Sequence, residues 1–174
     1  MRATILALLL SLSSFAVASQ GAAPQEPAPT AGAKKATPDP QVRRQLEELK
    51  YEFEVDEDGD YKLVFEVGGS TEKRSQLVYV RTPVESYGAL RVREIWSPGY
   101  KSKDKDFPAS VANRLLIATH DNKAGAWAKQ GEYAMFMVRL SANAPTKELD
   151  DAIDLAITSA DQMEAELSPG KDDL

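Results

Sequence analysis

The acidic stretch before Gly59 is the part of the chain nearest to a known chemical motif. Glu54, Asp56 and Asp58 alternate with other residues, like the oxygen ligands at positions 1, 3 and 5 of an EF-hand calcium loop, whose position 6 is glycine. Position 12 of that loop supplies a bidentate Glu, but the residue here is Phe65. The stretch therefore predicts a polar β-hairpin turn in which Gly59 has a positive φ. Weak adventitious Ca²⁺ binding is the alternative.

Residue types that hold zinc or act as nucleophiles are scarce. The sequence has no Cys, and His120 is its one His, so zinc sites built on thiolates or on two imidazoles are excluded. We predict that His120 lies in the last turn of a helix, where it interacts with the helix dipole. This structural role is favoured over general-base catalysis, because no G-x-S-x-G elbow supplies a nucleophile. Gly68, Gly69 and Ser70 lack the spacing of a phosphate-binding loop. We therefore predict no catalytic residue, no metal ligand and no cofactor, and we expect that the protein is not an enzyme.

Four residues are candidates for an interaction surface. Arg91 and Arg93 share one face of a predicted strand with Ile95, and they could bind a carboxylate or an acidic peptide. A solvated sheet face that discourages edge pairing is the alternative. Trp96 and Trp127 lie on two different predicted strands and could line a groove for an apolar segment, with core packing as the alternative.

Hydrophobic periodicity predicts three helices and six strands, and these elements would position the candidate residues. The 3.6-residue period of the first helix changes to alternation at Tyr51. Residues 97–100 include Pro98 and Gly99 and are expected to break the sheet. The predicted helices cover residues 40–50, 108–121 and 146–167, and the predicted strands cover residues 51–55, 61–67, 76–82, 89–96, 124–128 and 132–140.

The order of these elements predicts an α+β fold: a helix, an antiparallel β-meander, a helix, a β-hairpin and a helix. The last strand is apolar on both faces, as expected of a central strand. Because sheet edges must be covered, charged or paired, we predict a homodimer, or a complex in which an extended segment adds to an edge or fills a groove near Trp127. The last helix should bury one apolar stripe, formed by Leu149, Ile153, Ala156, Ala160, Met163 and Leu167.

Several short patterns resemble the bacterial YbjN family. They are residues 113–116, which read Asn-Arg-Leu-Leu, then Asn122, the hairpin around Gly131, and Ala160-Asp161 followed by Met163 and Leu167. The resemblance covers residues 40–168 and implies a fold like that of type III secretion chaperones, with homodimerisation and peptide binding. It implies no catalytic chemistry.

The first eighteen residues have the layout of a secretory signal peptide. Arg2 precedes an apolar run at residues 5–12, and small residues at Ala16 and Ala18 fit a cleavage site before Ser19. Residues 19–38 are rich in Ala and Pro and predict a disordered linker. We expect one YbjN-like domain at residues 39–168 and a frayed polar tail at 169–174.

Charge and export narrow the classes of function. The net charge of −6 disfavours nucleic acid and anionic membranes as partners. Because the sequence has no Cys and therefore no lipid-acceptor site, we expect no membrane anchor after signal cleavage. We expect a periplasmic or secreted bacterial protein that acts as a binding or chaperone-like module for a protein or peptide. The alternatives are a small-ligand sensor or regulatory protein, and a small carboxylate-based enzyme.

Overall fold

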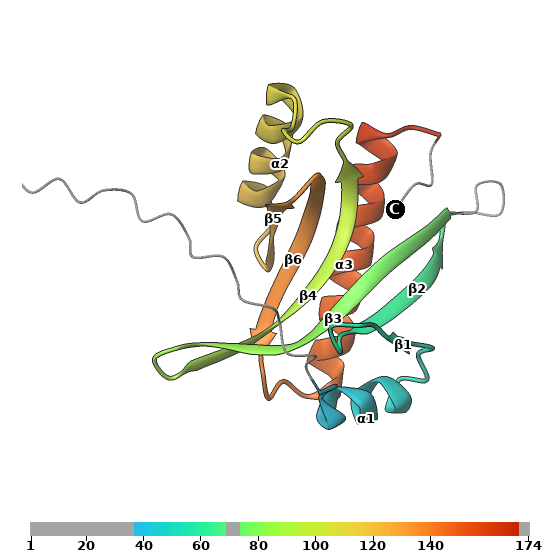
Figure 1. Cartoon of the computed structure of the whole chain (residues 1–174), viewed down its shortest axis with the longest axis vertical. Coiled ribbons are helices and arrows are strands. Elements are labelled where there is room, and N and C mark those ends of the chain that lie inside the picture. The colour runs from blue at the N-terminus through green and yellow to red at the C-terminus, as the bar shows by residue number, and fades with distance from the viewer. Residues whose placement is uncertain (1–36, 69–73, 171–174) are drawn as a thin grey trace, which may run out of the picture. The chain divides into compact units, whose positions relative to one another are not determined.

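The structure is a computed structural model and describes residues 37–68 and 74–170. The predicted signal peptide, most of the predicted linker and the end of the predicted tail lie outside the described residues. Figure 1 shows the arrangement of the elements. In chain order they are α1 (Pro40–Glu48), β1 (Glu54–Val55), β2 (Tyr61–Val67), β3 (Arg74–Tyr87), β4 (Leu90–Lys101), α2 (Ala109–Asp121), β5 (Gly125–Gln130), β6 (Tyr133–Ser141) and α3 (Thr146–Leu167).

The strands form one six-stranded sheet in the order β1-β2-β3-β4-β6-β5, and every neighbouring pair is antiparallel. α3 packs against β3, β4 and β6, and Figure 1 shows it crossing behind β3 and β4. α1 packs against α3, and α2 packs against β5. The predicted α+β fold and the order of its elements are therefore confirmed. Within the described ranges, no helix is long and apolar enough to cross a membrane.

The core fills the space between the sheet and α3. The sheet contributes every second residue of its central strands, including Val78, Val80, Ile95 and Phe136, which are all 0% exposed. This spacing follows from the two-residue period of a strand. We call this side of the sheet the helix-covered face. The stripe predicted for α3 faces it, with Leu149, Ile153, Ala156, Ala160 and Met163 buried and Leu167 half-buried.

β3 and β4 are longer than the sequence predicts, and each passes through a proline. β3 continues past Pro83 and β4 continues through Pro98, so the predicted break at residues 97–100 is wrong. The pairing register shifts between Val80 and Val84, and it shifts again directly after Pro98. A bulge leaves one residue outside the regular ladder, which accommodates a proline that has no N–H to donate.

Asp39 joins the start of α1 to the middle of the sheet. Its Oδ1 accepts a hydrogen bond of 2.8 Å from the backbone N–H of Gln41, as a helix N-cap does, and its Oδ2 pairs with Arg93. Arg93 is 3% exposed and also donates to the carbonyl oxygens of Arg81 (2.7 Å) and Thr82 (3.0 Å). Burial acts to raise the pKa of Asp39, but the Gln41 N–H and the Arg93 guanidinium outweigh it and lower that pKa.

α2 covers the outer edge of β5. The backbone N–H of Trp127 donates to Thr119 Oγ1 at 2.9 Å, and the N–H of Gly125 donates to Asn122 Oδ1 at 2.9 Å. This edge is therefore partly satisfied within the chain, which limits strand addition by another segment. His120 lies in the last turn of α2, as predicted.

Candidate functional site

The second face of the sheet carries large apolar and aromatic side chains as well. They alternate with the core residues along the same strands: Tyr79 follows Val78, Trp96 follows Ile95, and Met135 precedes Phe136. We call this side the open face, because α3 packs on the opposite side.

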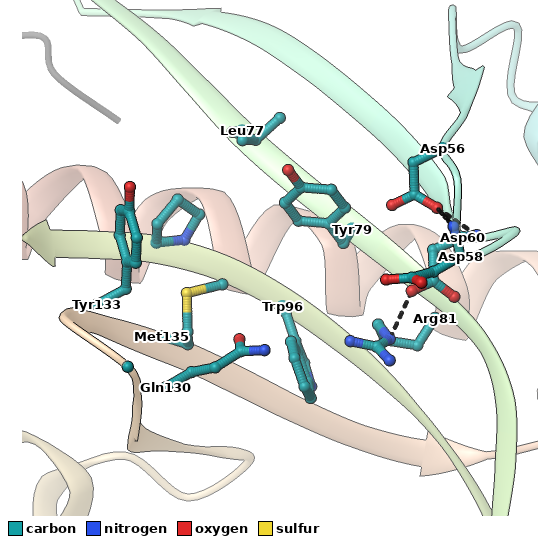
Figure 2. Close-up of a pocket in the computed structure, with 12 residues that line it drawn as sticks. Asp56, Asp58, Asp60, Leu77, Tyr79, Arg81, Trp96, Gln130, Tyr133 and Met135 are labelled. Carbon is teal, nitrogen blue, oxygen red and sulfur yellow. Dashed lines mark hydrogen bonds and ion pairs between the residues drawn. The ribbon is translucent and has the colours of Figure 1, made fainter. Parts of the chain in front are cut away.

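A hollow of about 520 Å³ lies on the open face, and no residue of the three helices lines it. We call it the groove. Figure 2 shows its acidic residues at one end and Tyr133 at the other, with Tyr79 and Trp96 between them. The lining residues are Asp56, Asp58, Asp60, Leu77, Tyr79, Arg81, Trp96, Pro98, Gln130, Gly131, Tyr133 and Met135.

Strand register aligns the floor of the groove across three strands. Tyr79 on β3 lies opposite Trp96 on β4, and Trp96 lies opposite Met137 on β6. One step along, Pro98 lies opposite Met135. Residues opposite each other in antiparallel strands point to the same side, so these side chains form one continuous apolar surface.

The acidic end of the groove is the β1–β2 turn. Asp56 Oδ1 accepts hydrogen bonds from the backbone N–H groups of Asp58 (3.0 Å) and Asp60 (2.9 Å), and Gly59 has a φ of 83°. The prediction of a polar hairpin turn with positive φ at Gly59 is confirmed. No group of three or more potential metal ligands occurs in the described part of the chain, and one oxygen of Asp56 is already used to shape the turn.

Asp60 and Arg81 link this turn to the aromatic floor. Asp60 is 2% exposed; its Oδ2 pairs with Arg81 Nε at 2.7 Å, and its Oδ1 accepts from the Thr82 N–H at 2.6 Å. Burial raises the pKa of Asp60 in spite of these two partners, and the negative charge of Asp56 raises it further. Arg81 in turn lies over the Trp96 ring, 4.2 Å from its centroid, which is a cation–π contact.

The aromatic residues of the groove also carry polar groups. Burial raises the pKa of Tyr79, and the nearby Asp56 raises it further, so its hydroxyl stays protonated near neutral pH. Trp96 Nε1 donates to Glu94 Oε2 at 3.0 Å. At the far end, Lys101 Nζ lies 5.0 Å from the Tyr133 ring centroid. The groove thus offers apolar contact along its floor and negative charge from Asp56 and Asp58 at one end.

The structure separates the four residues that the sequence suggests for an interaction surface. Trp96 lines the groove. Trp127 lies on the helix-covered face, half-buried, with its ring 5.2 Å from that of Phe136. Arg93 is buried against Asp39, while Arg91 is exposed near the end of the β3–β4 hairpin. Only Trp96 among them contributes to the groove.

A second, more polar cleft of about 330 Å³ lies between α2 and α3. Arg114 spans its rim and donates two hydrogen bonds of 2.7 Å to the carboxylate of Glu166. Trp127 and Phe136 form part of its wall. Because Arg114 and Glu166 pair with each other across the rim, this cleft has fewer unpaired polar groups for a ligand than the groove has.

Sequence reasoning did not identify most of the groove. The sequence pattern places Tyr79, Arg81, Tyr133 and Met135 on strands and assigns them no role, although residues 77–80 and 133–138 are apolar on both faces. That pattern is a usable signal, because a strand that is apolar on both faces needs a partner on each of them.

No family model matches the chain, and no curated protein matches it in sequence.

Proposed function

We propose that the protein is an exported, non-enzymatic binding or chaperone-like module that holds a segment of another protein chain on the open face. The single observation that carries this proposal is the groove, an aromatic hollow of about 520 Å³ formed by β3, β4, β6, the end of β5 and two turns, and lined by no helix residue. The N-terminal signal pattern supports export, and the resemblance to the YbjN family supports a chaperone-like role.

The chemistry of the groove suggests what the bound segment is like. Tyr79, Trp96 and Met135 provide an apolar floor, on which a large aliphatic or aromatic side chain loses contact with water. Asp58 is exposed, whereas Asp60 is neutralised by Arg81. We therefore expect an extended segment with an apolar side chain on the floor and a Lys or Arg directed toward Asp58 and its neighbour Asp56.

The dimensions of the groove can take an extended segment. Three neighbouring strands span roughly 10 Å at their usual spacing, which suits a peptide laid across them. An enzyme that uses carboxylate chemistry would need an accessible acid with a raised pKa. The pKa of Asp60 is raised, but that residue is 2% exposed and tied to Arg81 and Thr82.

Tryptophan fluorescence tests the proposal, because the chain has two Trp residues and they lie on opposite faces. In a Trp127→Phe variant, Trp96 is the sole indole. Titration with an extended peptide of alternating Leu and Lys should change its emission with saturation, and added salt should weaken the binding. A peptide with Glu in place of Lys should bind less tightly.

The matched control is Trp96→Phe, in which Trp127 alone reports from the helix-covered face. The peptide should leave its emission unchanged. A saturable response from Trp127 but not from Trp96, or no response to any apolar peptide, would contradict the proposal.

A further inference from the structure

The cleft between α2 and α3 has an aromatic floor. Trp127 on β5 and Phe136 on β6 form this floor, with Met163 of α3 beside them. The two rings meet edge to face, with 5.2 Å between their centroids and 64° between their planes. α2 packs against β5 and α3 packs against β6, so the two helices form the walls. We call this site the α2–α3 cleft.

Glycine at two positions makes room for these rings. A Cβ added at Gly99 of β4 would lie 2.5 Å from Trp127 Cη2, and a Cβ added at Gly125 would lie 2.3 Å from Phe136 Cζ. Both distances are far shorter than the contact distance of about 3.5 Å between carbon atoms. A side chain at either glycine would therefore push a ring out of place, and the backbone itself sets the position of the aromatic floor.

The charged side chains around the α2–α3 cleft sum to one negative charge. Arg114 supplies one positive charge, and Asp121 and Glu166 supply two negative charges. Because Arg114 pairs with Glu166, the charge that is not balanced is that of Asp121. Within residues 37–68 and 74–170, Asp121 forms no ion pair. It acts on Arg114 at longer range, as one of the charges that raise the pKa of that guanidinium.

The end of α2 adds to this negative potential. Asp121 is the last residue of the helix, where the carbonyl groups carry a partial negative charge that favours cations. One such carbonyl already binds a cation of the chain, since Lys123 Nζ donates to the His120 carbonyl oxygen at 3.1 Å. Lys123 does not line the α2–α3 cleft, so it leaves the carboxylate of Asp121 available there.

We propose that the α2–α3 cleft binds a small organic cation, a primary amine that carries an aromatic ring. The ring would pack on Trp127 and Phe136, and the ammonium group would pair with Asp121 and be attracted to the indole. This inference goes beyond the proposed function, because the cleft lies on the helix-covered side and shares no residue with the groove.

The size and the rim of the α2–α3 cleft fit such a ligand. Its volume of about 330 Å³ is at the lower end for small-molecule sites and suits one ring with a short chain. The side chains of Arg114 and Glu166 are 38% and 46% exposed, and exposed ion pairs contribute little to stability, so the rim can open. An anion would meet a net negative charge, and a neutral ligand would gain no ion pair with Asp121.

Fluorescence of the Trp96→Phe variant tests this inference, because Trp127 is then the sole indole. Titration with phenethylamine should change the Trp127 emission with saturation, at a dissociation constant on the order of 1 mM, as expected for so small a ligand. Phenylpropionate and phenethyl alcohol, which have similar shapes without the positive charge, should give no saturable change.

Three further substitutions in that variant identify the charge that the amine recognises. Asp121→Asn should weaken the binding of phenethylamine by about three- to fivefold. Arg114→Gln releases Glu166 and should strengthen it by about twofold or more. The matched control is Asp58→Asn, which removes an exposed carboxylate from the groove and should leave the affinity unchanged. All three side chains reach solvent, so their replacement leaves the core intact.

Four results would overturn the inference. They are the absence of a saturable response from Trp127, an equal response to phenylpropionate or phenethyl alcohol, an affinity that Asp58→Asn lowers as much as Asp121→Asn does, and an affinity that does not rise in Arg114→Gln. The peptide titration of the groove is read by Trp96 in a different variant, so the proposed function stands or falls independently of these results.

Discussion

The two faces of the sheet are built by the same strands, yet one is a core and the other is a groove. On β4, Ile95 is 0% exposed beneath α3, whereas Trp96 is half-buried on the opposite side. On β3, the same contrast separates Val78 from Tyr79. Both faces carry large apolar side chains. The faces differ in that α3 covers only one of them, so an apolar side chain on the other face is available to another molecule.

The largest expected effect separates the two tryptophans. Trp127→Ala should lower the free energy of unfolding by about 3–5 kcal/mol, as truncation of a packed aromatic does, because the ring packs on Phe136. Trp96→Ala should lower it by roughly 1–2 kcal/mol while abolishing peptide binding. Urea unfolding of both variants checks this order. Equal losses would mean that the open face is part of the core.

A second prediction concerns the buried ion pair on the helix-covered face. Asp39→Ala removes the partner of Arg93, whose side chain is 4% exposed, and should cost about 3 kcal/mol because a buried charge is left unpaired. Asp58→Ala, at the exposed turn on the groove, should change the stability by less than about 0.5 kcal/mol. Chemical denaturation compares the two carboxylates, and a similar cost for both would contradict the distinction between the faces.

As the pH falls into the acid range, Asp39 and Asp60 should change the free energy of unfolding in opposite directions. The pKa of Asp39 is lowered, so its contribution is present above its unfolded value, near 3.9, and is lost as the pH falls through the folded value. The pKa of Asp60 is raised, so the folded state takes up its proton first and gains stability as the pH falls toward the unfolded value. Asp39→Asn should therefore flatten the loss of stability in acid, and Asp60→Asn should steepen it. The free energy of unfolding of both variants, measured from pH 7 to about pH 3, checks this prediction. If stability falls with pH equally steeply in the two variants, the prediction is wrong.

The smallest expected effect is that of calcium. Ca²⁺ at millimolar concentration should leave the thermal midpoint unchanged, because one oxygen of Asp56 is used by the turn and Asp60 is paired with Arg81. Any ligand that binds the folded state alone would raise the midpoint. A rise of many degrees in Ca²⁺ but not in Mg²⁺ would show that the acidic end of the groove is a metal site.

Elements with strong periodicity could be predicted from the sequence. The stripe of α3, the turn at Gly59 and the paired strands β5 and β6 each follow from residue patterns within one segment. The continuation of β3 past Pro83 and of β4 past Pro98 could not be predicted from the sequence. A proline usually interrupts a strand, but it is tolerated where the pairing register shifts. Whether the register shifts depends on the neighbouring strand, and the sequence of one segment alone does not show this.

The candidate site was harder to predict for the same reason. Its residues come from β3, β4, β6, the end of β5 and two turns, so the groove exists only once the register is known. Trp96 lines the groove, but the argument that selects it also selects Trp127, whose ring packs on Phe136 on the helix-covered face. Arg93 illustrates the remaining gap: its burial depends on Asp39, which lies far away in the sequence and meets it only through the packing of α1.

Site-specific photo-crosslinking tests the central claim, that the open face is the binding surface, most directly. A photoreactive residue placed at Gln130, exposed on the groove, is compared with one at Leu116, exposed on α2. We predict that Gln130 captures a partner chain, that the Leu and Lys peptide competes with this capture, and that Leu116 captures nothing under the same conditions. Capture at Leu116 but not at Gln130, or equal capture at both positions without competition by the peptide, would contradict it.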